Sequence, residues 1–213
     1  MLVFVFYLTN FFFLKKNKCG SHDDTYELVR NHIMALKRVP FLRRAHILFA
    51  IERNMAHESG HIWHNIRNIE NVHPICEKKE DIVGIYTSQF NKPKYAISAR
   101  EHVIRGSITI AQNIVCANPR MKTESGSIIP AQDRPKFILD KLREQLLRYR
   151  QIESDTTDPI STTRMSVSGV ADRHGKKDPS AKDDLAFTFT FCCGTTDALR
   201  QDKFKFVQKD WLP

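Results

Sequence analysis

The sequence lacks the features that mark several common protein classes. Its five cysteines are odd in number and show no C-x-x-C spacing, so they indicate neither a disulfide framework nor a four-thiolate zinc site. Cysteine usage of this kind favours a reducing, intracellular compartment. The sequence also contains no internal repeat, no heptad pattern and no G-x-x-x-x-G-K-[ST] phosphate loop, which argues against a repeat protein, a coiled coil and a P-loop motor.

No hydrophobic run is long enough to span a bilayer. Residues 1–14 are strongly apolar, but a transmembrane helix needs roughly 20 such residues. No basic residue precedes this run and no small-residue cleavage site follows it, as a signal peptide would require. We interpret residues 2–8 as a buried strand, expect the chain to be truncated at its N-terminus, and predict no membrane attachment.

The sequence contains enough apolar residues to form a hydrophobic core, and it carries an excess of positive charge. The 213 residues are 41% hydrophobic and carry a formal net charge of +9. Basic clusters recur at residues 15–18, 43–44, 141–150 and 176–177. Such a charge attracts polyanions, with nucleic acid as the first candidate partner and an acidic membrane surface as the second, although it is also typical of an ordinary solvated surface.

Expected strands and helices alternate along the chain. We predict helices at about 23–38, 55–70, 94–105, 134–151 and 183–195, strands at 2–8, 45–51, 82–86, 108–115 and 165–170, and loops at 152–164 and 172–182. The segment 45–51 is apolar throughout, as expected of a strand with both faces covered. This alternation predicts an α/β fold with a mixed sheet flanked by helices.

Carboxylates stand at the ends of two apolar segments. Glu52 closes the run 46–51, and Asp183 and Asp184 open the run 185–191. A carboxylate at a strand end and a pair at a helix start are two thirds of a metal-dependent nuclease site, and the third, an aspartate on an earlier strand, is absent. Two alternatives remain open: an ion pair of Glu52 with a neighbouring arginine, and an acidic helix start that the helix dipole favours by about 0.3–1 kcal/mol.

A second motif predicts different chemistry. Residues 57–61 read H-E-x-x-H, so on a helix His57 and His61 would share a face and could bind Zn²⁺, with Glu58 as general base. His64 could supply the third ligand from the next turn. Against a zinc site stand Gly60, which weakens a helix by roughly 1 kcal/mol, and the nine histidines, which make a chance match easier. Histidines on a solvated or DNA-facing helix are the alternative.

Four segments carry a family pattern in the same order and at similar spacing. They are residues 42–54, ending in A-I-E-R-N; 91–110, with N-K-x-K; 137–147, with L-x-x-Q-L; and 169–186, with G-K followed by D-D-L. In this combination the chain resembles the C-terminal nuclease domain of herpesvirus-type DNA-packaging terminase large subunits. The resemblance covers residues 2 to about 197, nearly the whole chain.

The resemblance implies an RNase H-like fold, here lacking the first strands, in a nuclease domain at 1–197 followed by a basic C-terminal tail at 198–213. It implies two Mg²⁺ or Mn²⁺ ions held by an acidic cluster, with Glu52 as the second acidic residue and Asp183 or Asp184 as the third. The substrate would be concatemeric double-stranded DNA, the partners other terminase subunits and the portal, and the location the host nucleus.

This chain departs from the family at three points. The first acidic residue would precede Met1, so we expect the isolated chain to be inactive as a nuclease. Arg53 replaces the glycine that follows the glutamate, and the H-E-x-x-H segment has no counterpart. Three hypotheses therefore stay open: a metal-dependent endonuclease, a DNA-binding remnant that does not cut, and a zinc hydrolase.

Several basic side chains near these motifs are candidate DNA contacts. They would bind phosphates and read charge, not base sequence. Each could equally be a solvated surface residue. The candidates are Arg53, Arg105, Lys176, Lys177 and Lys182.

Overall fold

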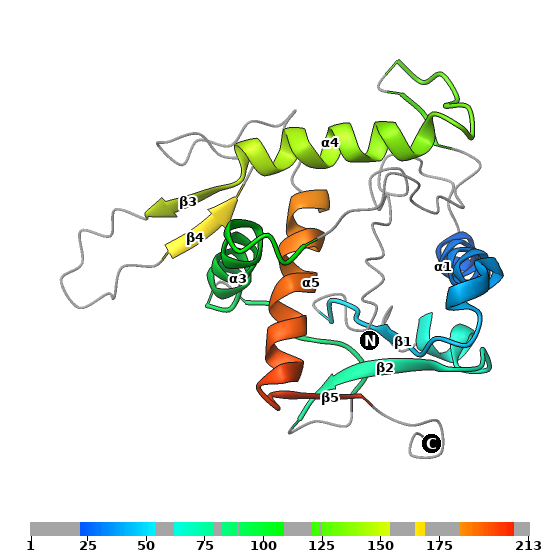
Figure 1. Ribbon diagram of the computed structural model, residues 1–213, viewed down its shortest axis with the longest axis horizontal. Coiled ribbons are helices and arrows are strands. Elements are labelled where there is room, and N and C mark those ends of the chain that lie inside the picture. The colour runs from blue at the N-terminus through cyan, green and yellow to red at the C-terminus, as the bar shows by residue number, and fades with distance from the viewer. Residues whose placement is uncertain are drawn as a thin grey trace. The chain divides into compact units, whose positions relative to one another are not determined.

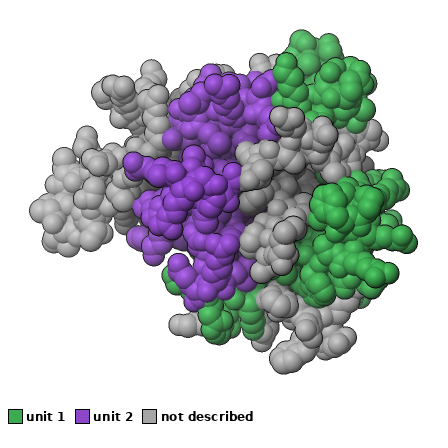
Figure 2. Space-filling model, in the orientation of Figure 1, with its two compact units in different colours: residues 1–86, 111–138, 202–213 green, residues 87–110, 139–201 purple. Residues whose placement is uncertain are grey.

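The computed structural model describes residues 22–53, 62–78, 82–88, 90–108, 121–123, 125–153, 165–168 and 184–206. The chain divides into two compact units, which are coloured separately in Figure 2. The first comprises residues 1–86, 111–138 and 202–213, and the second comprises 87–110 and 139–201. The nuclease domain expected at 1–197 therefore spans parts of both units.

A small three-stranded sheet lies in the first unit (Figure 1). Its strands are β1 (Ile47–Phe49), β2 (Val72–Glu77) and β5 (Phe204–Phe206), in the order β1-β2-β5. β1 pairs with β2 in parallel, whereas β5 pairs with β2 antiparallel. The prediction of a mixed α/β protein with a mixed sheet is therefore confirmed.

The central strand β2 contains a proline, Pro74, which is unusual for a strand with neighbours on both sides. The register explains how the sheet accepts it. β1 pairs with residues 72–74 of β2, and β5 pairs with residues 75–77. Because Pro74 lies outside the part of β2 that pairs with β5, its missing N–H removes no hydrogen bond from that ladder. Local sequence patterns predicted no strand at these residues.

The core of the first unit joins α1 (His22–Arg38) to the sheet. Val29, Ile33 and Leu36 recur at helical spacing and are buried, as the sequence predicted. They pack in one cluster with apolar residues of β1, β2 and the helical residues 62–66. Pro40 then begins a short 3-10 helix, η2 (Pro40–Leu42).

The second unit is built on two packed helices, α3 (Lys92–Ile104) and α5 (Asp184–Arg200), which lie side by side in Figure 1. Tyr95 of α3 meets Phe191 of α5 edge to face, with ring centroids 5.7 Å apart. Gly194 lies beneath the Tyr95 ring, because a Cβ at this position would overlap three ring atoms. A residue without a side chain therefore sets how closely α5 approaches α3.

The remaining elements correct several expected boundaries. The helix expected at 134–151 ends earlier: α4 is Arg134–Arg148, and β3 (Arg150–Glu153) follows and pairs antiparallel with β4 (Met165–Ser168). The expected end of the last helix at 195 is also wrong, since α5 continues to Arg200. β5 lies within the stretch expected to be a tail.

Other predicted elements lie partly or wholly outside the described residues. The strand at 2–8, most of the strand at 108–115 and the loop at 172–182 are outside them. Of the helix expected at 55–70, residues 62–66 are helical. Among the helices that the structure describes, none combines the length and the apolar content that crossing a membrane requires.

Candidate functional site

Glu52 follows the carboxyl end of β1, in the first unit. Two backbone hydrogen bonds flank it: Ile85 N–H donates to Ile51 O, and Arg53 N–H donates to Ile85 O, both at 2.8 Å. These bonds form a parallel bridge between Glu52 and Ile85 and fix the backbone on both sides of the glutamate. A half-buried carboxylate therefore stands beyond the end of a buried strand, on a backbone that is held in place.

The other acidic position of the predicted site is at the start of α5, in the second unit. Asp184 is the first residue of this helix, and Asp183 lies outside the described residues. The free N–H groups of the first turn have a specific acceptor. Gln145 of α4 is buried, and its Oε1 accepts hydrogen bonds from Leu185 N at 2.8 Å and Ala186 N at 3.2 Å. A side chain from another helix thus caps α5 immediately after Asp184.

A complete cation site is not present among the described side chains. Over residues 22–53, 62–78, 82–88, 90–108, 121–123, 125–153, 165–168 and 184–206, no three His, Cys, Asp or Glu residues gather closely enough to hold a metal ion. Glu52 and Asp184 belong to different compact units, and each is therefore described within its own unit. Carboxylate oxygens remain the correct donor type for Mg²⁺ or Mn²⁺.

Of the alternative zinc ligands, only His64 belongs to the described part of the chain. It is exposed on the helical residues 62–66. His57, Glu58 and His61 lie outside the described residues, so the zinc hydrolase stays a hypothesis.

The candidate DNA contacts also lie partly inside and partly outside the described residues. Arg53 is half-buried beside Glu52. Arg105 is exposed at the end of α3, where its Nη2 lies 3.3 Å from Glu101 Oε2, so a DNA phosphate would compete with this carboxylate. Lys176, Lys177 and Lys182 lie outside the described residues.

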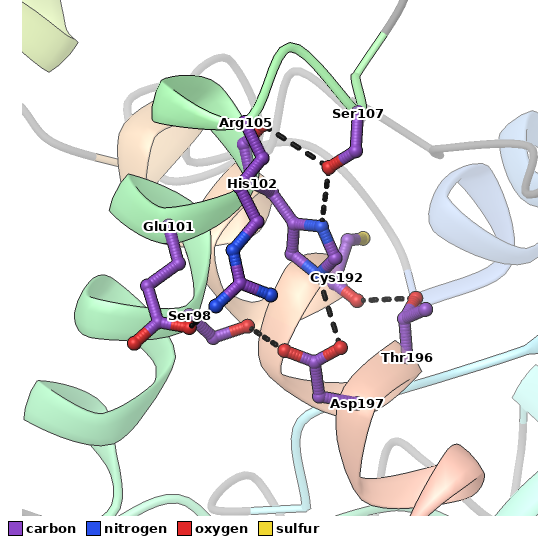
Figure 3. A network of polar contacts seen from close by, with 8 residues as sticks. All are labelled: Ser98, Glu101, His102, Arg105, Ser107, Cys192, Thr196 and Asp197. Atoms are coloured by element: carbon purple, nitrogen blue, oxygen red, sulfur yellow. Dashed lines mark hydrogen bonds and ion pairs between the residues drawn. The ribbon is translucent and has the colours of Figure 1, made fainter.

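A polar network that sequence spacing does not indicate joins α3 to α5 (Figure 3). Asp197 lies at its centre: Ser98 Oγ donates to Asp197 Oδ2 at 2.5 Å, and His102 Nε2 lies 3.0 Å from Asp197 Oδ1. The other ring nitrogen, Nδ1, lies 2.7 Å from Ser107 Oγ. Desolvation alone would raise the pKa of Asp197, but the hydrogen bonds from Ser98 and His102 and the nearby positive charges hold it below its ordinary value.

Ser107, His102 and Asp197 have the composition of a hydrolase triad, and their hydrogen bonds also have a structural role at the end of α3. Ser107 Oγ donates to the backbone oxygen of His102 at 3.1 Å, and Ser107 N donates to the same oxygen at 3.0 Å. The single hydroxyl proton of Ser107 has two acceptors within reach, this carbonyl oxygen and His102 Nδ1, which lies 2.7 Å from Oγ. The network closes the carboxyl end of α3 and ties it to α5.

The neighbouring thiols, Cys192 and Cys193, do not supply a nucleophile. Burial is the main reason that the pKa of Cys192 and of Cys193 is raised to about 12, with smaller contributions from Cys193 on Cys192 and from Asp197 on Cys193. A thiol with so high a pKa is almost entirely protonated near neutral pH, and the thiolate is the reactive form. A Cys–His catalytic pair with His102 is therefore not supported.

We expect Asp197→Asn to lower the free energy of unfolding by about 1–3 kcal/mol at neutral pH, because it weakens two hydrogen bonds to a charged acceptor. Urea denaturation measures the loss. Because the folded-state pKa of Asp197 is lowered, its contribution is complete above the ordinary carboxyl pKa and is lost as the pH falls through the lowered value. The difference between the two proteins should therefore shrink below about pH 4.

Asp140→Asn, at an exposed position of α4, is the control. Equal stability of the Asp197→Asn variant and the unsubstituted protein at neutral pH would contradict the prediction.

Comparisons with known proteins leave these observations to stand alone. No protein-family model, no curated protein and no solved structure matches the chain. The functional argument therefore rests on residues of this chain.

Proposed function

We propose that the chain is the RNase H-like nuclease domain of a DNA-packaging terminase that cleaves concatemeric DNA with two divalent cations. One observation supports this proposal best. Two of the four segments that carry the family resemblance, L-x-x-Q-L and D-D-L, meet through a buried side chain, because Gln145 caps the start of α5 directly after Asp184. Through this contact both segments would have the same structural role, which is to hold the acidic start of α5 in place.

Each residue then has a defined task. Glu52, Asp183 and Asp184 would hold Mg²⁺ or Mn²⁺, which when bound would stabilise the attacking and leaving oxygens of the phosphodiester. Arg53 and Arg105 would contact DNA phosphates, as would Lys176, Lys177 and Lys182. The protein would act in the host nucleus, with other terminase subunits and the portal as partners.

Binding of Mn²⁺ tests the proposal on the chain itself. The signal of free Mn²⁺ in electron paramagnetic resonance should fall as the protein is added. We expect Glu52→Ala and the pair Asp183→Asn and Asp184→Asn each to weaken Mn²⁺ binding about tenfold or more, since even outer-shell changes have effects of this size. Asp140→Asn, which removes an exposed carboxylate from α4, should leave binding unchanged.

Cleavage tests the reaction. We predict that a protein that combines this chain with a further acidic ligand nicks supercoiled plasmid with Mn²⁺ and that Glu52→Ala abolishes nicking. Full nicking by the Glu52→Ala variant would overturn the assignment. DNA binding without any Mn²⁺ binding would instead identify a remnant that does not cut, and stoichiometric zinc that His61→Ala removes would favour the zinc hydrolase.

A further inference from the structure

A pocket in the first unit is lined by more cations than carboxylates. It has a volume of about 870 Å³ and lies between α1, Arg43 and residues 65–70. The charged residues that line it are Glu27, Arg30, Lys37, Arg38, Arg43 and Glu70. Four cations thus face two carboxylates, which leaves the pocket with an excess of positive charge.

The rotation of α1 explains why these cations share one side. Val29, Ile33 and Leu36 are buried in the core and fix which face of the helix turns inward. Arg30 and Lys37 are seven residues apart, or two helical turns, and therefore lie on one face, along the edge of the buried stripe next to Ile33. The core thus orients the basic face of α1 outward, towards the pocket.

Lys37 is the most constrained of the four cations. Its Nζ donates a hydrogen bond to Ala45 O at 2.7 Å, which fixes the ammonium group at the pocket wall. Desolvation lowers the pKa of Lys37, and the charge of Glu70 partly restores it. The ammonium group has therefore lost part of its hydration. A bound anion would replace the favourable electrostatic interaction that the lost water no longer provides.

The three arginines are available for a ligand. Arg30, Arg38 and Arg43 are exposed. None of the three forms an ion pair with a carboxylate in the described part of the chain. A guanidinium group stays charged at any physiological pH and matches the geometry of a phosphate with two parallel hydrogen bonds.

We propose that this pocket binds the phosphate backbone of nucleic acid. Arg30 and Arg38 are eight residues apart on α1, which corresponds to about 12 Å along a helix. One strand of duplex DNA advances by about three to four phosphates over that length, so the row of cations fits an extended polyanion better than one isolated phosphate. This inference goes beyond the proposed nuclease, because contacts between cations and phosphates require no divalent ion.

Fluorescence anisotropy with a labelled DNA duplex in EDTA tests the pocket independently of any cation site. We expect the double variant Arg30→Gln and Arg43→Gln to bind about tenfold or more weakly and to reduce the slope of log K against log salt by about two, because two phosphate contacts are lost. The matched control is Lys94→Gln with Arg100→Gln, two exposed cations of α3 in the other unit. Equal weakening by both double variants would show an effect of net charge alone and overturn the proposal.

A variant that is expected to bind DNA more tightly distinguishes the loss of a phosphate contact from a loss of binding caused by misfolding. Glu27→Gln removes a carboxylate from the pocket wall and should tighten DNA binding severalfold, whereas Asp140→Asn on α4 should tighten it much less. Unchanged affinity in Glu27→Gln would contradict the proposal. So would full competition by inorganic phosphate at the same phosphate concentration as the DNA, or stronger binding to anionic lipid vesicles that the arginine variant abolishes. A negative result in these DNA-binding experiments would not bear on the Mn²⁺ experiments, because the DNA-binding measurements are all made in EDTA.

Discussion

Replacing Gly194 with alanine is expected to destabilise the protein, although alanine is the better helix former. In an exposed helix this substitution would gain about 1 kcal/mol. Here the added Cβ would overlap Cδ1, Cγ and Cε1 of Tyr95, whose ring is buried against Phe191. Overpacking of a buried contact typically costs about 1–3 kcal/mol, so we expect the free energy of unfolding to fall despite the gain in helix propensity.

A double-mutant cycle identifies the ring as the cause. Tyr95→Ala removes the atoms that the new methyl group would overlap, at its own cost of about 3–5 kcal/mol for the cavity. In that background Gly194→Ala should cost nothing or should stabilise the protein. A cost for Gly194→Ala that is the same with and without the Tyr95 ring, measured by urea denaturation, would show that the overlap is not the reason.

Replacing Gln145 with leucine is expected to loosen the start of α5. Leucine keeps the volume of the side chain but removes the oxygen that accepts hydrogen bonds from Leu185 N and Ala186 N. Both residues are inaccessible to water, with 2% and 0% of their surfaces exposed, so neither N–H can turn to solvent. Each buried donor that loses its acceptor costs about 1–3 kcal/mol.

Three measurements check this prediction together. Urea denaturation gives the loss in the free energy of unfolding, and hydrogen exchange should show faster exchange at the first amides of α5. Because Asp184 begins the same helix, Mn²⁺ binding should weaken as well. Gln201→Leu, the same change at an exposed position, is the control and should stay within about 0.5 kcal/mol of the unsubstituted protein. Unaltered exchange at Leu185 and Ala186 would contradict the prediction.

Local periodicity predicted the parts of the fold that depend on neighbouring residues. The spacing of Val29, Ile33 and Leu36 placed α1 and its buried face, because each helical turn brings these side chains to the same side. The apolar run around Ile47–Phe49 predicted β1 for a similar reason, since a strand covered on both faces needs no polar alternation.

Elements that depend on distant partners were not predictable in this way. β2 contains His73 and Pro74, which on local preference argue against a strand, and its pairing with residues far along the sequence decides the outcome. β3 replaces the expected last turn of α4 because Arg150–Glu153 pairs with β4. Propensity is a weak influence beside such tertiary contacts.

The candidate sites also combine features that local sequence predicts with features that only the structure shows. Gln145 lies in a segment that the sequence had singled out, although its role as a cap for α5 required the structure. His102 and Asp197 are separated by 95 positions in the sequence, and no spacing rule connects them. The pocket cations on α1 share a helical face, but Arg43 joins them only through the turn after η2.

The order of pairing in the three-stranded sheet has a consequence for synthesis on the ribosome. β1 and β2 leave the exit tunnel early, whereas residues 204–206, which cover the other side of β2, are translated on the order of ten seconds later at ordinary elongation rates. During that interval the half of β2 around Ile75–Glu77 offers unpaired N–H and C=O groups to any passing strand. Nascent chains should therefore depend on chaperones, and products that terminate before residue 204 should aggregate more readily than finished ones.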